Sequence, residues 1–300
     1  MTSPVVPPRL AVGVVGTGRV GAVLGAALES AGHRVVAASA VSAASRSRAA
    51  ALLPSSRLVP AHLVPADADL VLLAVPDDAL PELVAGLAAT GSLRPGQLVA
   101  HTSGRHGLAV LEPARRAGAV PLALHPVLPF SGTSADLHRL VGAAWGVTCS
   151  DAALPVAQAL VLELGGLLER VPEERRPLWH AALAHAANHL TALVASSADL
   201  LREAGAERPD RVLAPLLDAA LAGTLERGDA ALTGPVARGD AGTVRAHLDV
   251  LAAVAPEVLP SYLAMARLTA DRALGAGLLD PTRAGALLEV LGTAPAGGRS

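Results

Sequence analysis

The sequence predicts an α/β protein in which a doubly wound parallel sheet is followed by an all-helical C-terminal domain. Two observations predict this fold. Short apolar runs alternate with helical segments up to about residue 172, as in a parallel sheet covered on both faces. From there to Gly292 only helical periodicity is found. We expect domains over 1–172 and 173–292, and a disordered tail over 293–300.

The predicted strands are short apolar runs that end at polar residues, glycine or proline. They cover residues 10–15, 34–40, 69–75, 98–101, 120–124 and 145–148. A helix is expected from Gly18 to about Ala31, where Gly32 and His33 end it. In the second half, helix-breaking residues separate the predicted helices: Pro209, Gly228, Pro235, Gly239 and Pro256.

Composition limits the chemistry that the chain can perform. A net charge of −2 provides no basic field for nucleic acid or an anionic membrane. All 24 basic residues are arginine, so a lysine general acid or Schiff base is excluded. The single cysteine, Cys149, excludes an internal disulfide and a Cys-based zinc cluster. It also fits a cytoplasmic location, as does an N-terminus without a signal-peptide pattern.

The longest uncharged run, residues 177–198, is long enough on paper to span a bilayer. Its three histidines, one asparagine and opening proline are costly in lipid. We therefore expect a buried helix of a soluble protein and no membrane partner.

The first predicted strand is followed by Gly16-x-Gly18-x-x-Gly21, which opens a predicted helix. This context is typical of a dinucleotide site, because the glycines allow a tight turn, a close approach of pyrophosphate and helix–strand packing. The helix N-terminus supplies N–H groups for the phosphates. The predicted cofactor-binding residues here are Gly16, Thr17, Gly18, Arg19, Val20 and Gly21, with Val75 and Pro76 after a later strand. The alternative is a glycine turn without a ligand.

The end of the second predicted strand favours NADP(H) over NAD(H). NAD sites place an acidic residue here, but none occurs between Glu29 and Asp67. The segment provides Ser42 and Arg46 instead, with Ser45 and Arg48 nearby. Hydroxyl donors and a guanidinium suit a 2′-phosphate. The alternative is that the arginines are only solvated on a helix surface.

Two polar stretches, HTSG (101–104) and LHPVLPF (124–130), follow the carboxyl ends of predicted strands, where open α/β sheets bind ligands. His125 precedes proline, which restricts its backbone, and the ordinary pKa of histidine suits proton transfer near neutrality. We expect His125 and Ser103 to be catalytic and Thr102 to bind substrate. A histidine satisfied by backbone groups is the alternative for His125.

The stretch WHAALAHAANHL, residues 179–190, places His180 and Asn188 on neighbouring positions of one helical arc. We expect this helix to form an active-site wall, with both residues catalytic. His185 and His189 have a metal-chelating spacing, but no third ligand is apparent, so no metal is expected. A bundle helix with water-bonded polar residues is the remaining alternative.

The segment LTGPVARGD, residues 232–240, breaks the helical pattern. Arg238 has the planar fork that holds a carboxylate, and Thr233 precedes the break. Both are predicted to bind substrate, although a loop arginine is more often only solvated.

Six motifs occur in a fixed order: GVVGTGRVG, LLAVPDD, HTSG, HPVLPF, LWHAALAHAANHL and LTGPVARGD. From about Leu10 to Leu274 the chain resembles Rossmann-like oxidoreductases with a helical C-terminal domain of unknown-function type. These proteins are relatives of 6-phosphogluconate dehydrogenase, pyrroline-carboxylate reductase and ketopantoate reductase. The resemblance implies a dinucleotide-binding domain, a helical dimerisation domain that forms a homodimer, and a cleft between them.

The chain departs from these relatives at one position. Ketopantoate reductases carry Lys-x-x-x-Asn on the cleft helix; Asn188 fits the asparagine, but Ala184 stands in place of the lysine. In prephenate dehydrogenases a strand-end Ser and a later His-Pro supply hydrogen bonding and proton transfer, and Ser103 and His125 are similar in placement. The resemblance thus implies that His125 or His180 replaces the lysine.

These observations together predict an NADPH-dependent reductase of a small carbonyl compound bearing a carboxylate. The resemblance implies a branched 2-oxo acid like ketopantoate. We expect His125 to donate the proton with His180 in reserve, Asn188 to hold the carbonyl oxygen or the nicotinamide carboxamide, and Arg238 to hold the carboxylate. The alternatives are a non-catalytic NADP-binding sensor or scaffold, an imine reductase of the pyrroline-carboxylate reductase type and, weakest, a metal-dependent hydrolase.

Overall fold

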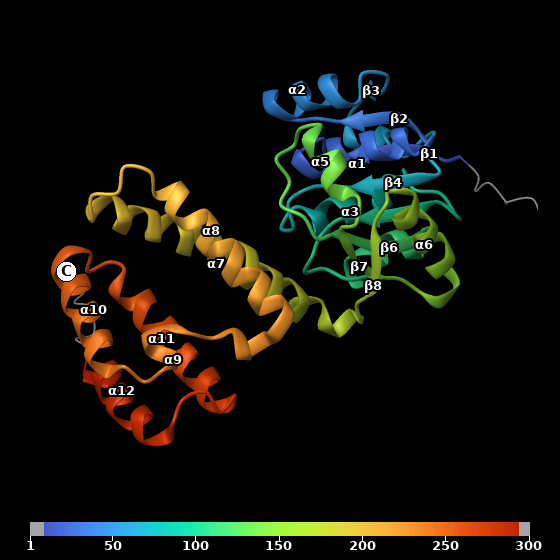
Figure 1. The fold of residues 1–300 in the computed structure, drawn as a ribbon. Helices are drawn as coiled ribbons and strands as arrows, with labels where there is room; N and C mark the ends of the chain where they lie inside the picture. The colour runs from blue at the N-terminus through green and yellow to red at the C-terminus, as the bar shows by residue number, and fades with distance from the viewer. Residues whose placement is uncertain (1–8, 294–300) are drawn as a thin grey trace, which may run out of the picture. The chain divides into compact units, whose positions relative to one another are not determined.

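The computed structural model describes residues 9–293, and the chain divides into two compact units after Ala186 (Figure 1). The first unit is an α/β domain and the second is helical. Each unit is described by itself below. The predicted tail lies outside the described residues, apart from Thr293, which is the last residue of its helix.

The first unit contains one eight-stranded sheet in the order β3-β2-β1-β4-β5-β6-β7-β8. The strands are β1 (Ala11–Val15), β2 (Arg34–Ser39), β3 (Arg57–Leu58), β4 (Leu70–Leu73), β5 (Leu98–His101), β6 (Val120–Pro126), β7 (Ala144–Thr148) and β8 (Leu167–Arg170). All six predicted strands are present. The two that the sequence did not predict, β3 and β8, are short edge strands with mostly exposed residues.

The prediction of a parallel sheet is wrong for one pair of strands. Neighbouring strands run parallel except β6 and β7, which are antiparallel and pair His125 with Gly146. The residues Trp145 and Val147 of β7 are both buried. A buried strand is a continuous apolar run whichever way it points, so its own sequence does not specify its direction.

Helices cover both faces of this sheet (Figure 1). They are α1 (Arg19–Ser30), α2 (Ala43–Leu52), α3 (Leu80–Ala89), α4 (Glu112–Arg116), α5 (Ala135–Leu140) and α6 (Leu154–Glu163). One core joins α1, α5 and α6 to strand residues such as Val12 and Val14. The other joins α3 and α4 to strand residues such as Val15 and Val71. Successive strand residues thus feed opposite cores, as the alternation of side chains along a strand requires.

The predicted glycine turn joins β1 to α1, and two of its glycines are required by geometry. Gly16 has φ +94°, a left-handed conformation that L side chains rarely adopt. At Gly21 a Cβ atom would lie 2.0 Å from the carbonyl oxygen of Gly16 and 2.8 Å from Cβ of Ala74. The first glycine therefore makes the turn, and the last lets helix α1 pack against it.

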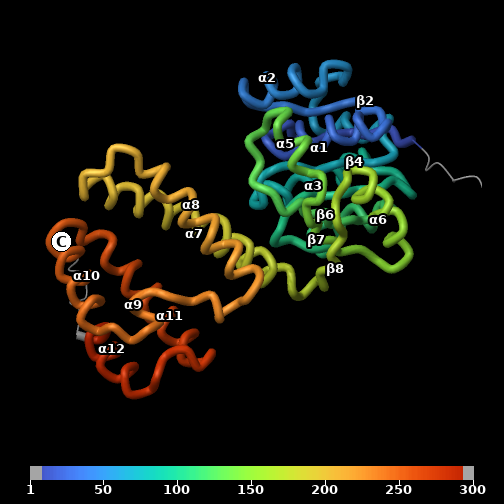
Figure 2. Tube along the Cα trace, in the orientation of Figure 1, coloured from blue at the N-terminus to red at the C-terminus, as the bar shows by residue number. Residues whose placement is uncertain are grey.

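Helix α7 (Arg176–Glu203) runs from the first unit into the second, where the chain continues as helices (Figure 2). They are α8 (Pro209–Arg227), α9 (Gly234–Ala237), α10 (Ala241–Val254), α11 (Leu259–Gly275) and α12 (Pro281–Thr293). The predicted all-helical pattern is confirmed, and each predicted break lies at a helix end. The core of this unit is built mainly by α10, α11 and α12.

Helices α7 and α8 contribute little to that core. Among the described residues of α7 only Arg176 is buried, and among those of α8 only Pro209 and Leu213. Large apolar side chains of α8 are exposed instead, including Leu216 at 62% and Leu225 at 79%. The expectation of a buried helix over 177–198 is therefore not met within the single chain. No helix in the described part of the chain is long and apolar enough to cross a membrane.

The glycine turn provides a test of this packing. We expect Gly21→Ala to destabilise the protein by about 1–3 kcal/mol, because the added methyl collides with backbone that cannot move away. The matched control is Gly86→Ala in the exposed interior of α3, where a Cβ meets nothing within 4 Å. That change should stabilise by roughly 0.5–1 kcal/mol. Urea unfolding measures both; equal effects of the two substitutions contradict the assigned role of Gly21.

Candidate functional site

The glycine turn is fastened to the end of β2 by Ser39. The Ser39 hydroxyl accepts from the backbone N–H of Gly16 at 3.1 Å, and its carbonyl accepts from the N–H of Thr17 at 3.0 Å. The Thr17 side chain is fully buried, with its hydroxyl 3.1 Å from the carbonyl oxygen of Ser45. Thr17 therefore holds the turn from inside, and only its backbone faces the predicted cofactor side.

The opposite side of the turn has the features that a phosphate group needs. A Cβ at Gly18 meets nothing within 4 Å, so a ligand can approach the backbone there. Helix α1 begins at Arg19 with no side-chain cap and no acidic residue in its first turn. Its first N–H groups, including that of Val20, are thus available to an anion. Val75 lies against Gly16, with Cγ1 3.0 Å from a Cβ built there, and Pro76 is exposed.

The segment after β2 lies at the same end of the sheet. Ser42 caps helix α2, where its hydroxyl accepts from the N–H of Ser45 at 3.1 Å. Arg46 is exposed and donates from one guanidinium nitrogen to the carbonyl of Val41. No acidic side chain follows β2, whose end is taken by Ser39. The cationic and hydroxyl groups predicted to meet a 2′-phosphate are therefore on one exposed helix end.

The loop after β6 reaches the glycine turn. At Gly132 (φ +83°) a Cβ would lie 2.7 Å from Cγ of Arg19 and 2.9 Å from Nε of Arg48, so the loop backbone passes between these two arginines. The buried Asp136 carboxylate accepts from the N–H of Gly132 at 2.8 Å and from the hydroxyl of Ser131 at 3.0 Å. Burial raises the pKa of Asp136, but these hydrogen bonds outweigh it and the net pKa is lowered. Asp136 thus stays ionised and holds the loop against α1.

His101, the last residue of β5, organises the HTSG loop. Its Nε2 donates to the carbonyl of Gly107 at 2.8 Å, and its Nδ1 accepts from the N–H of Ser103 at 3.2 Å. Burial lowers the pKa of His101 to about 4, so the ring is neutral at pH 7. The hydroxyl of Ser103 accepts from the N–H of His106, and Thr102 donates its backbone N–H to Leu73. His101 therefore has a structural role, and it sets the course of the backbone that carries Thr102 and Ser103.

His125 lies near the end of β6 with two side chains of α7 against it. The indole N–H of Trp179 donates to His125 Nδ1 at 3.3 Å, and the His180 ring packs edge-on at a centroid distance of 6.2 Å. A Cβ at Gly104 would lie 2.9 Å from His125 Nε2 and 2.7 Å from His180 Cδ2. The structure thus brings together three of the predicted site elements of this unit: His125, His180 and the HTSG loop.

The expectation that His125 has a pKa near neutrality is wrong. Burial, and after it the electrostatic effects of Arg176 and His180, lower the pKa of His125 to about 4, against a smaller opposing effect of Asp77. The imidazole is therefore neutral at pH 7, and it can donate or accept a hydrogen bond but is not a standing acid.

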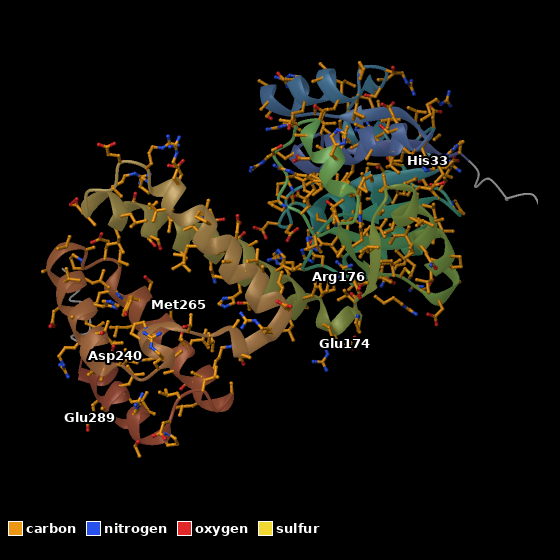
Figure 3. All side chains as sticks on the ribbon, in the orientation of Figure 1. His33, Glu174, Arg176, Asp240, Met265 and Glu289 are labelled. Atoms are coloured by element: carbon orange, nitrogen blue, oxygen red, sulfur yellow. The ribbon has the colours of Figure 1, made fainter. Side chains whose placement is uncertain are left out.

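Arg176, the first residue of α7, has a fully buried side chain, and Figure 3 labels its position. Its nitrogens donate to the carbonyls of Ser103, Ala123 and Gly146 and to the hydroxyl of Thr148, at 2.8–3.0 Å. Burial lowers the pKa of Arg176 to about 10, so it remains charged at pH 7. No carboxylate among residues 9–293 lies within 4 Å of it. The site therefore contains a buried positive charge with only neutral hydrogen-bond partners.

Glu173 fixes the chain just before this arginine. Its carboxylate accepts from the backbone N–H groups of Leu108 and Ala109, at 2.6 and 3.0 Å. Any side chain at Gly107 would collide with that carboxylate. The HTSG loop and the start of α7 are thus joined from two sides, by Glu173 and by Arg176.

Three of the predicted site residues lie in the second unit. Asn188 is exposed on α7, Thr233 is exposed at the start of α9, and Arg238 lines a surface pocket of about 380 Å³ with Asp280 and Arg283. Their roles toward substrate stay predictions. Among the described residues, no group of three His, Cys, Asp or Glu side chains is placed to hold a metal ion.

Sequence reasoning missed the residues that act by long-range contact: Ser39, Arg176 and Trp179. One signal for Trp179 was available, since it is one of only four aromatic residues and immediately precedes His180. Arg176 has no such signal, because it follows another arginine in a segment that reads as solvated.

Two family models match the sequence. Residues 1–126 match the Rossmann-like domain, and residues 143–269 match the domain of unknown function DUF2520. The chain therefore carries a Rossmann-like domain followed by a DUF2520 domain, which begins with β7. No curated protein matches the chain.

Solved structures share the fold at low sequence identity. BF3122 from Bacteroides fragilis, a candidate NADP oxidoreductase, has a TM-score of 0.75 at 22% identity, over 88% of this chain and 98% of that chain. An imine reductase from Pseudomonas sp. has 0.65 at 18%, over 95% and 100%. Pyrroline carboxylate reductase from Plasmodium falciparum, with NADP bound, has 0.59 at 10%, over 93% and 98%. These likenesses establish that the fold is one found in NAD(P)-dependent oxidoreductases.

Proposed function

We propose that this protein is an NADPH-dependent reductase of a small carbonyl compound that bears a carboxylate. The observation that carries the proposal is the arrangement of the carboxyl edge of the sheet. The glycine turn after β1 can take a dinucleotide, His125 and His180 meet near the end of β6, and the loop through Gly132 connects the two places. A hydride donor at the first place and hydrogen-bond donors at the second are what carbonyl reduction needs.

The exposed end of α2 supports NADP(H) as the cofactor, because Arg46 and Ser42 stand where NAD-selective sites carry a carboxylate. The structural neighbour from Plasmodium falciparum, which was solved with NADP, is in line with this choice. The 2′-phosphate is the only group that distinguishes the two cofactors, so its partners should affect NADPH alone.

We expect Arg46→Ala to weaken NADPH binding by about 10- to 100-fold, since a charge-assisted hydrogen bond is worth roughly 1.5–3 kcal/mol, and to leave NADH binding unchanged. The control is Arg34→Ala, which removes an exposed arginine from the other end of β2. Titrations of cofactor fluorescence measure the affinities of the unaltered protein and of both variants for each cofactor. Tighter binding of NADH than NADPH by the unaltered protein contradicts the cofactor assignment.

For the substrate, we propose a 2-oxo acid of the ketopantoate kind, as in the ketopantoate reductase-like superfamily. His125 then donates to the carbonyl oxygen, with His180 as a second donor. An imine reductase is the second candidate, because two structural neighbours are named as an imine reductase and a pyrroline carboxylate reductase. A non-catalytic NADP-binding sensor is the third candidate, because Ala184 of α7 stands where ketopantoate reductases carry a lysine.

A panel of 2-oxo acids and cyclic imines, followed by NADPH absorbance and starting with ketopantoate, tests the reaction. We expect turnover of a 2-oxo acid, and a loss of about 10²- to 10⁴-fold in kcat for His125→Ala, as for loss of a proton donor. NADPH affinity should hold. The control, His62→Ala, removes an exposed histidine from the helical turn after β3. NADPH binding without turnover of any compound in the panel favours the sensor.

We also propose that the protein forms a homodimer through its helical unit. Helices α7 and α8 leave apolar side chains exposed, and burying such surface against a second copy is favourable. We expect a dimer at micromolar concentration in sedimentation velocity, and a monomer for the double change Leu216→Glu with Leu225→Glu on α8. Leu58→Glu on β3, an exposed leucine of the first unit, should leave the dimer intact. A monomeric unaltered protein contradicts this proposal.

A further inference from the structure

Trp179 determines which ring nitrogen of His125 carries the proton. An indole N–H can only donate a hydrogen bond, so the His125 Nδ1 that receives it at 3.3 Å must present a lone pair. In the neutral ring the proton is then on Nε2. Trp179 itself is fixed against β7, where a Cβ at Gly146 would lie 2.9 Å from its indole Nε1.

The charged groups around His125 keep the ring neutral. Arg176 donates to the carbonyl of Gly146, the residue paired with His125 across the two strands, and to that of Ala123. Its hydrogen-bond partners are all neutral, and the carboxylate of Glu173 stabilises its charge from beyond ion-pair distance. The other titratable groups that act on His125 are His180 and Asp77, and only Asp77 favours protonation. Burial and the nearby guanidinium together outweigh it.

The Nε2 side of the ring faces the backbone of Gly104. Any side chain at this position would collide with Nε2 or with His180, so only glycine lets the backbone lie this close to the imidazole. Within residues 9–293, no protein group accepts a hydrogen bond from His125 Nε2, whereas Nδ1 is occupied by Trp179. The remaining Nε2–H donor lies near the end of β6, at the edge of the sheet where open α/β folds bind ligands.

We propose that Trp179 is a positioning residue that holds His125 as a neutral Nε2–H donor, and that this donor hydrogen-bonds to the oxygen of a substrate carbonyl. The substrate is thus a carbonyl compound rather than a protonated imine. The inference rests on the proposed reductase function and deepens it. Hydride from NADPH forms a C–H bond, the C=O π electrons move to oxygen, and NADPH becomes NADP⁺. The resulting alkoxide takes the Nε2 proton and leaves an imidazolate, whose negative charge lies in the field of Arg176. Solvent water then returns a proton to Nε2 and leaves as hydroxide.

Charge decides between the two substrate classes. A carbonyl is neutral and becomes negative as hydride arrives, so the field of Arg176 favours its transition state over its ground state. A protonated imine is positive at the start and becomes neutral, so the same field opposes its binding. The buried guanidinium therefore favours carbonyl compounds at this site.

Nitrogen-15 NMR of the histidine side chains tests the tautomer without any substrate, in the full-length protein with and without NADPH. His125→Gln assigns the signal. We expect the Nε2–H form of His125 and no titration of this ring between pH 5 and 8. An Nδ1–H form, or a titration midpoint near 6.5, overturns the proposal. The spectrum of the unaltered protein decides the tautomer, and His125→Gln serves only to assign the signal.

Trp179→Phe keeps an aromatic ring and removes the donor. Because a neutral hydrogen bond is worth up to about tenfold in an equilibrium, we expect the tautomer ratio to fall by up to that factor. kcat should fall in parallel while KM for NADPH stays unchanged. The matched control is Trp145→Phe, since the buried indole N–H of Trp145 has no hydrogen-bond partner. An unchanged tautomer in Trp179→Phe, or an equal change in Trp145→Phe, contradicts the role of Trp179.

The pH profile and the substrate panel complete the test. For a neutral donor, kcat with a 2-oxo acid should stay level from pH 5.5 to 8, whereas an imidazolium acid loses activity as pH rises through about 6.5. Turnover of cyclic imines and of no 2-oxo acid overturns the carbonyl assignment. If no compound is reduced, the proposed function fails while the tautomer measurement still stands or falls by itself.

Discussion

The arrangement of the candidate site depends on one buried cation. Arg176 donates to the loop after β5, to β6 and to β7, and so connects the first turn of α7 with three parts of the sheet edge. A neutral side chain of the same length removes the hydrogen bonds to three carbonyls and to the Thr148 hydroxyl, and a hydrogen bond to a charged group is worth about 1.5–3 kcal/mol. Glu173 anchors the same turn to the backbone at Leu108. The positions of Trp179 and His180 follow, because they stand on the helix that these two residues fix.

Two histidines of the sheet edge differ in role although both have a pKa of about 4. His101 uses both ring nitrogens within the protein, so it holds the loop and has nothing left for a ligand. His125 uses Nδ1 for Trp179, and no group in the described part of the chain accepts a hydrogen bond from its Nε2, which lies beside Gly104. Hydrogen-bond accounting therefore separates the structural histidine from the candidate functional one, where sequence position and pKa do not.

The parts of the structure that the sequence predicted are those encoded locally. The glycine turn needs a left-handed residue at position 16 and a close backbone approach at position 21, and only glycine meets these needs within one short segment. The strand ends that carry His101 and His125 are marked by a change from apolar to polar residues. The direction of β7 and the contacts of Arg176 were not predictable, because they join residues far apart in the sequence, such as Arg176 and Gly146 at a separation of 30, and leave no periodic signal. Likewise, the pKa of His125 depends on its neighbours in space.

In a chain without lysine the basic side chains are arginine and histidine, and the candidate site uses one of each, the first charged and the second neutral. Arginine stays charged when buried, as Arg176 does with a pKa of about 10, whereas a buried lysine readily loses its proton. Its field on His125 is therefore constant across the pH range in which an ordinary histidine titrates. The lysine that the relatives carry on the cleft helix combines a positive charge and a proton donor in one group. In the proposed site the charge belongs to Arg176 and the donor is His125, whose neutral ring can serve as that donor because the charge is fixed elsewhere.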